Sequence, residues 1–216
     1  MGVANTERAY IPAAGRHWRL PLYDPLTKLL GVDRTRRRLV EQAELARGQR
    51  VLEVGCGTGS LLIDIGRRHP AVELVGLDPD ANALTRAERK ARQAGVRVRL
   101  DRGFSDAMPY EDASFDRVLS SFMYHHVPQH EKPAMFREIH RILKPGGRLE
   151  LLDFAGPERA HGFFARMLHA HHLMIDNAEA HVIALMTEAK LSNAARVGDD
   201  AFLLGSVSYY QAVRAH

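Results

Sequence analysis

Short apolar runs alternate with longer, more polar stretches along residues 50–155, and this alternation predicts most of the secondary structure. The apolar runs predict buried strands at 50–54, 72–77, 96–100, 116–121 and 147–153. The longer stretches between them predict helices at 60–69, 81–94 and 128–143. Strands and helices that alternate at this length indicate a parallel sheet with helices on both faces.

Polar residues and glycines indicate where several of these elements begin and end. Asp33 is expected to cap a helix that runs to about Ala46. Asp80 is expected to cap the helix at 81–94, and Gly95 to end it.

The last forty residues predict a helix followed by two strands. Residues 176–179 have the spacing of a capping box, so a helix should run from there to Ala189. Residues 194–199 and 202–213 predict strands, with a hairpin turn at Gly198-Asp199-Asp200.

Composition is that of a single domain. The chain has 216 residues, 45% of them apolar, and no Pro/Gly/Ser-rich linker divides it, so one sizeable core is expected. A single cysteine excludes an internal disulfide and favours a reducing, cytoplasmic setting. No apolar run is long enough to span a membrane, and the first residues lack the apolar region of a signal peptide.

The chain is basic, with a formal charge of +4 and an isoelectric point near 9.4. Its arginines gather at 34–38 and 86–102, where glutamates are interleaved with them, as on a solvated helix face. No aromatic residues are interleaved to stack on bases, so nucleic acid is not an expected partner.

A glycine-rich loop joins the first strand to the next helix in Val51-Leu52-Glu53-Val54-Gly55-Cys56-Gly57-Thr58-Gly59. Glycines let such a loop turn tightly and admit a ligand against its backbone. A dinucleotide-binding loop has the pattern GxGxxG, but Ser60 stands here in place of its last glycine. About twenty residues on, Asp78 ends the next strand, where a carboxylate can accept hydrogen bonds from ribose hydroxyls; the alternative role is capping of the following helix.

These residues resemble motif I of the class I S-adenosylmethionine (SAM) methyltransferases. Two further segments are similar to the ubiquinone/menaquinone-type methyltransferases: Phe115-Asp116-Arg117-Val118-Leu119-Ser120-Ser121-Phe122-Met123-Tyr124-His125-His126-Val127 and Leu143-Lys144-Pro145-Gly146-Gly147. The resemblance implies a single-domain, doubly wound, Rossmann-like α/β fold. Its sheet would have seven strands, mostly parallel with an antiparallel final strand, and helical lid elements would cover it. SAM is the implied cofactor and S-adenosylhomocysteine (SAH) its product.

The resemblance also implies a set of cofactor-binding residues. The loop would wrap the methionine end and ribose of SAM, Glu53 would help to anchor its amino group, and Asp78 would bind the ribose. The full set is Glu53, Gly55, Cys56, Gly57, Thr58, Gly59, Asp78, Pro79, Phe104, Ser105 and Ser121. Similar sequences usually have an acid or Asn, which often receives the adenine amino group, where Phe104 stands. Adenine would then rely on main-chain groups, on a neighbour such as Asp106, or on ring packing.

His125 and His126 are the candidate catalytic residues, because they follow the fourth strand at the edge where open α/β sheets bind ligands. Either could act as general base toward an alcohol, phenol or amine. Adjacent side chains diverge on extended backbone, so one of the two is expected to face the cavity. The alternatives are packing roles for both residues and catalysis by proximity alone.

Neither Cys56 nor the histidine cluster at 169–172 is expected to have a catalytic or metal-binding role. Cys56 is expected to be a small filler, and its being the only cysteine argues against arsenite methylation, for which similar enzymes use several thiolates. His169, His171 and His172 cluster on a helix-like stretch without an acidic partner at matching spacing. A polar cavity lining is therefore favoured over a metal site, and no metal is expected.

The resemblance divides the single domain, 1–216, into four parts: a lid or substrate cover at 1–46, the SAM-binding core at 47–155, a helical substrate or interface insertion at 156–192 and a closing hairpin at 193–216. The expected function is transfer of a methyl group from SAM to a small-molecule acceptor, with O-, N-, S- and C-nucleophiles all open. The alternative is a non-catalytic SAM-binding module that dimerises. A homodimer is compatible with both.

Overall fold

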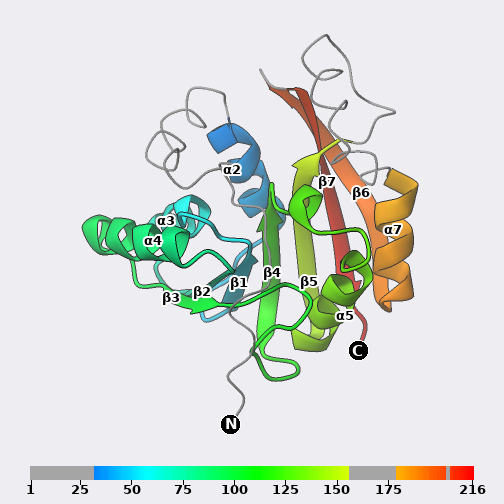
Figure 1. Cartoon of the computed structure of the whole chain (residues 1–216), viewed down its shortest axis with the longest axis horizontal. Coiled ribbons are helices and arrows are strands. Elements are labelled where there is room, and N and C mark those ends of the chain that lie inside the picture. Colours follow the sequence, from blue (N-terminus) through cyan, green and yellow to red (C-terminus); the bar gives the residue numbers. More distant parts are fainter. Residues whose placement is uncertain (1–31, 156–178, 203–204) are drawn as a thin grey trace.

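The computed structural model describes residues 32–155, 179–202 and 205–216, which form a sheet with helices on both faces (Figure 1). The seven strands lie in the order β3-β2-β1-β4-β5-β7-β6. They are β1 (Arg50–Val54), β2 (Glu73–Asp78), β3 (Arg99–Arg102), β4 (Phe115–Ser121), β5 (Leu143–Phe154), β6 (Leu191–Phe202) and β7 (Gly205–Arg214). The helices are α2 (Val32–Gln42), α3 (Ser60–Arg68), α4 (Ala81–Ala94), α5 (Lys132–Ile142) and α7 (Glu179–Glu188), with a 3₁₀ turn, η2, at Tyr124–His126.

The sheet is parallel from β3 to β5 and antiparallel beyond. β1 pairs in parallel with both β2 and β4, β2 with β3, and β4 with β5. β7 then runs antiparallel to β5 and to β6. This confirms the predicted fold class. The order of the parallel strands reverses between β1 and β4, and open α/β sheets bind ligands outside such a switch point.

Two apolar cores cover the two faces of the sheet. Leu52 and Val54 of β1 pack in the core under α5 and α7, whereas Val51 packs in the core under α2 and α3. Successive strand residues point to opposite faces, which explains this division. The helices contribute apolar stripes: Met135, Phe136, Ile139 and Ile142 from α5 on one face, and Leu61, Leu62 and Ile65 from α3 on the other.

The predicted hairpin turn at Gly198-Asp199-Asp200 is wrong. β6 continues through these residues and pairs with β7 as far as Phe202. The pairing shifts register between Arg196 and Gly198, so the ladder is irregular there but does not reverse. A Cβ on Gly198 would lie 2.2 Å from Nη2 of Arg38. Gly198 thus lies within the strand beside the guanidinium of an arginine from α2, and not in a turn.

Helix α4 begins and ends as predicted. The Asp80 side chain accepts hydrogen bonds from the backbone N–H groups of Asn82 and Ala83, and Gly95 ends the helix in the left-handed conformation. These side-chain and glycine caps replace the backbone partners that a helix lacks at its ends.

Other boundaries differ from the predictions. Asp33 lies inside the first turn of α2, which starts at Val32, and α2 ends at Gln42, well before Ala46. β3 starts at Arg99 instead of 96. The helix expected from residue 128 starts at Lys132, because a turn comes first, in which the N–H groups of Glu131 and Lys132 donate to the carbonyl of Pro128. β5 starts at Leu143, ahead of the expected 147.

Parts of the predicted organisation fall outside the described residues. Of the expected cover at 1–46 the structure describes the part from Val32 on, and of the insertion at 156–192 it describes residues from Glu179 on. The cluster of His169, His171 and His172 lies outside the described residues. No helix in the described ranges is long and apolar enough to cross a membrane.

Candidate functional site

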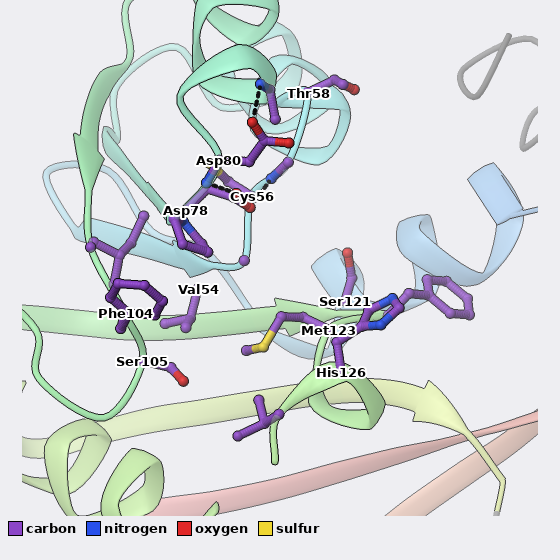
Figure 2. Close-up of a pocket in the computed structure, with 18 of the residues that line it drawn as sticks. Val54, Cys56, Thr58, Asp78, Asp80, Phe104, Ser105, Ser121, Met123 and His126 are labelled. Carbon is purple, nitrogen blue, oxygen red and sulfur yellow. Dashed lines mark hydrogen bonds between the residues drawn. The ribbon is translucent and has the colours of Figure 1, made fainter. Parts of the chain in front are cut away.

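A cavity of about 240 Å³ opens at the carboxyl ends of the parallel strands, beside the switch point between β1 and β4 (Figure 2). Ten of the predicted site residues line it: Gly55, Cys56, Gly57, Thr58, Asp78, Pro79, Phe104, Ser105, Ser121 and His126. The other three, Glu53, Gly59 and His125, do not line it. The structure thus brings residues from four strand ends to one cavity.

The glycine loop after β1 owes its path to three left-handed residues. Gly55, Gly57 and Gly59 have φ angles of 72°, 51° and 73°, which other residues adopt only with strain. A Cβ on Gly55 would lie 2.1 Å from Cγ of Met123, and one on Gly59 would lie 3.0 Å from Cβ of Ala87. A Cβ on Gly57 would meet no described atom within 4 Å. Gly59 therefore allows the loop to pack on α4, and Gly57 leaves space at the cavity.

Asp78 ties this loop to the end of β2. One carboxylate oxygen accepts from the Gly57 N–H at 2.8 Å and the other from the Asp80 N–H at 2.9 Å. The residue is 9% exposed, and burial raises its pKa to about 6 despite these two hydrogen bonds. Each oxygen still has a second lone pair, so a ligand at the cavity can donate to it. Asp80 takes the capping role. Both carboxylates line the cavity, and Asp78 is the one that joins the glycine loop to the end of β2.

Glu53 lies behind the cavity wall and not on it. It is 2% exposed, and its Oε1 accepts from Oγ of Ser121 at 3.3 Å. No donor among the described residues reaches its Oε2. Burial raises the pKa of Glu53 to about 8, and this outweighs the lowering by the charge of Arg36. A buried carboxyl group with one oxygen unpaired is costly, and a cationic donor bound beside it would offset that cost.

The chain turns sharply after β4 and so presents one histidine to the cavity. Phe122 has a φ of 55°, an unusual value for a bulky residue. The turn places Met123 against Gly55 and leads into η2, where the N–H of His126 donates to the carbonyl of Met123 at 2.9 Å. Figure 2 shows Met123 and His126 on the same side of the cavity. His125 instead reaches a carboxylate of β5.

The two histidines have different electrostatic surroundings. Burial, and then the charge of His125, lower the pKa of His126 to about 4, so His126 is neutral at pH 7. Nδ1 of His125 lies 2.7 Å from Oδ1 of Asp153, which is 1% exposed. The cavity therefore contains a neutral imidazole with a ring nitrogen that can accept a hydrogen bond, although burial makes it a weaker base than an exposed histidine.

Phe104 and Ser105 follow β3 and line the cavity together with Pro79, which follows β2. A backbone bridge between Phe104 and Ala107 shapes this loop. Asp106, one candidate for the adenine contact, does not line the cavity. Main-chain groups and ring packing remain as the possible contacts of an adenine bound near Phe104.

Sequence reasoning missed three residues of the site. Arg36 of α2 lines the cavity, with its guanidinium carbon 5.9 Å from the centre of the Phe122 ring. Lys90 of α4 donates to Oγ1 of Thr58 at 3.1 Å, and Asp153 holds His125. Arg36 is one of four arginines at 34–38, and nothing in the sequence distinguishes the one that faces the cavity.

Comparisons with known proteins identify methyltransferases as the relatives of this chain. A family model described as a methyltransferase domain matches residues 51–147. The chain is 40% identical over 147 residues to a demethylmenaquinone methyltransferase of Deinococcus radiodurans, across 67% of this chain and 59% of that protein. It is 32% identical over 161 residues to a ubiquinone/menaquinone biosynthesis C-methyltransferase of Geotalea uraniireducens, across 72% of this chain and 67% of that protein.

The chain spans about three fifths of the length of the first of these curated relatives. Among solved structures, the YcgJ protein from Bacillus subtilis superposes with a TM-score of 0.72 at 18% identity, across 85% of this chain and 99% of that one. At that identity the similarity shows a shared fold.

Proposed function

Since the chain belongs to the family of class I SAM-dependent methyltransferases, we propose that it transfers the methyl group of SAM to a hydroxylated aromatic acceptor of the hydroquinone type. The observation that carries the proposal is a neutral, cavity-facing His126 next to the glycine loop. The names of the relatives, which refer to demethylmenaquinone and to ubiquinone/menaquinone biosynthesis, support this acceptor class.

The described residues fit SAM, which supplies an electrophilic methyl group on its sulfonium when bound. Asp78 would accept hydrogen bonds from the ribose hydroxyls, because both of its oxygens keep a lone pair. Ser121 lines the cavity in front of Glu53, and the buried carboxyl group would stabilise the ammonium group from behind this wall. Arg36 is the cation at the cavity wall that would take the carboxylate.

The other wall of the cavity suits a flat, apolar acceptor. Met123, Val127 and Pro128 line the cavity together with His126, and Glu131 adds a carboxylate to the lining. Apolar walls with a few placed polar groups are typical of small-molecule sites. They would orient an aromatic ring so that one hydroxyl meets the imidazole.

In the proposed reaction His126 accepts the proton of the acceptor hydroxyl at a ring nitrogen. The electron pair left on oxygen then raises the nucleophilicity of the conjugated ring carbon. That carbon would take the methyl group as the carbon–sulfur bond of the sulfonium breaks and SAH leaves. Its hydrogen would then be lost as a proton to solvent while the oxygen regains a proton, so that the ring becomes aromatic again and one proton is released overall. A general base of this kind contributes about 10²–10⁴-fold, and orientation of the two partners contributes further.

The test is methyl transfer from isotope-labelled SAM to 1,4-naphthohydroquinone, with the oxidised quinone and the hydroquinone dimethyl ether as controls. We expect a ring-methylated product from the hydroquinone alone, because only this compound has a hydroxyl proton to remove. His126→Ala should lower kcat by about 10²–10⁴-fold and leave the affinity for SAM nearly unchanged. Equal transfer to all three compounds, or to none while SAM is bound, would refute the proposal.

A further inference from the structure

Asp153 is a buried carboxylate that touches no reacting group, yet it holds a neighbour of the proposed base. Its Oδ1 accepts from the Phe154 N–H and from Nδ1 of His125, both at 2.7 Å, and its Oδ2 accepts from the His125 N–H at 3.2 Å. Burial would raise the pKa of Asp153, but His125 and the backbone donors outweigh it and hold the pKa below its ordinary value. The ionised carboxylate therefore fixes His125 by both ring and backbone.

The ring of His125 lies between this carboxylate and His126. The ring centroids of His125 and His126 are 4.0 Å apart, with 41° between the planes. On another side, His125 packs edge-on against Phe154 at 5.0 Å and 73°. The side chain of His125 is 10% exposed and does not line the cavity. Its contacts are thus directed at neighbouring side chains and not at a ligand.

His126 depends on packing for its orientation. Its Nδ1 is buried, and no described group forms a hydrogen bond with it. In many sites a second hydrogen bond fixes the orientation of a working imidazole. Here the hydrogen bonds fix the neighbouring ring of His125 instead, and that ring lies tilted against His126.

We propose that Asp153 and His125 are positioning residues, which together hold the imidazole of His126 at the cavity wall. Because an ionised carboxylate only accepts, Nδ1 of His125 carries the hydrogen, and this sets the tautomer and the plane of the His125 ring. That ring then supports His126. The inference rests on the proposed function, in which His126 removes the proton of the acceptor.

Asp153→Asn is the decisive variant, because an amide offers one acceptor oxygen to three N–H donors and must release one of them. His125→Phe keeps a ring against Phe154 and His126 but has no donor for Asp153. Glu150→Gln is the matched control: Glu150 is a fully buried carboxylate of the same strand, but it accepts from Gln211 of β7 and does not line the cavity.

Asp153→Asn and His125→Phe should each lower kcat roughly tenfold to a hundredfold, as a small misplacement of a reacting group does. The affinity for SAM and the KM for the acceptor should change little, and Glu150→Gln should keep wild-type kcat. The double variant Asp153→Asn/His125→Phe should lose no more than the stronger single variant, because both act through His126. Wild-type kcat in Asp153→Asn, or additive losses in the double variant, would overturn the inference.

Ring ¹H–¹⁵N spectra of the histidines in the SAH complex separate this inference from the proposed function. The His126 signals should shift in Asp153→Asn and stay in place in Glu150→Gln. If the wild-type protein methylates no hydroquinone but the His126 signals shift in Asp153→Asn alone, the positioning role holds and the proposed function fails. If the His126 signals are the same in Asp153→Asn as in the wild type, the positioning role is refuted whatever the activity.

Discussion

Glu53→Gln tests whether the buried carboxyl group of Glu53 lowers the stability of the protein and at the same time contributes to binding of the cofactor. Burial raises the pKa of Glu53 from 4.5 to about 8. Because the folded-state pKa lies above the unfolded one, the unfolded chain loses this proton first as the pH rises. The free energy of unfolding should therefore be highest below about pH 4.5 and fall as the pH rises toward 8.

The magnitude follows from the two pKa values. At pH 7 the unfolded carboxyl group is ionised and the folded one is mostly protonated, which costs about 3 kcal/mol of stability; at pH 5 the cost is below about 1 kcal/mol. Glutamine has nearly the shape of the protonated carboxyl group and can still accept from Ser121. It should remove the pH-dependent cost and add little else.

The assay is urea unfolding of the wild type and of Glu53→Gln at pH 5 and pH 7, with calorimetric titration by SAH. The difference in free energy of unfolding should be small at pH 5 and favour the variant by about 3 kcal/mol at pH 7. The difference isolates Glu53, because the other buried carboxyl groups are present in both proteins. Binding of SAH at pH 7 should weaken by less than about 1.5–3 kcal/mol, the value of a hydrogen bond to a charged group, because Glu53 must first lose its proton to become a charged partner of the ammonium group. A variant that is no more stable than the wild type at pH 7 would show that Glu53 carries no such cost, and one that binds SAH as tightly would show that Glu53 does not stabilise the ammonium group.

Three further predictions follow from single sites. Asp78→Ala should weaken the binding of SAH by about 1.5–3 kcal/mol without unfolding the protein, and an unchanged dissociation constant would make Asp78 purely structural. Gly57→Ala should cost about 1 kcal/mol of stability for its left-handed φ, and Gly55→Ala more, because its Cβ would also meet Met123; equal melting temperatures would contradict the close approach. Lys190→Gly should stabilise the protein by up to about 1 kcal/mol, since Lys190 follows α7 with a φ of 65°, and a lower melting temperature would contradict this.

The fold could be predicted where local signals agree with the tertiary structure. The strand, loop and helix from Arg50 to Arg68 combine an apolar run, glycines and a helical stretch, and all three appear in the structure. Gly198 shows where such reasoning fails. A glycine before two aspartates is a turn signal within the sequence, but here β6 continues through it and pairs with β7, which no local pattern reveals.

The same contrast holds for the site. Asp78 and the loop glycines were predictable, because the position of a carboxylate or a glycine after a strand has a direct structural meaning. For His125 and His126 the sequence predicted only that the two adjacent side chains point in different directions. Which one faces the cavity depends on the strained turn at Phe122 and on Asp153, twenty-eight residues away from His125. Arg36 could not be predicted for the same reason, because its position at the cavity also depends on tertiary contacts.

The most direct test of the account is calorimetric titration of the wild-type protein with SAH and, separately, with NADH. The left-handed glycine loop, Asp78 and the buried Glu53 together fit a nucleoside that carries an ammonium group, and Ser60 stands where a dinucleotide loop has its last glycine. We expect saturable one-to-one binding of SAH and no measurable binding of NADH. Tighter binding of NADH than of SAH would contradict the assignment of the cavity.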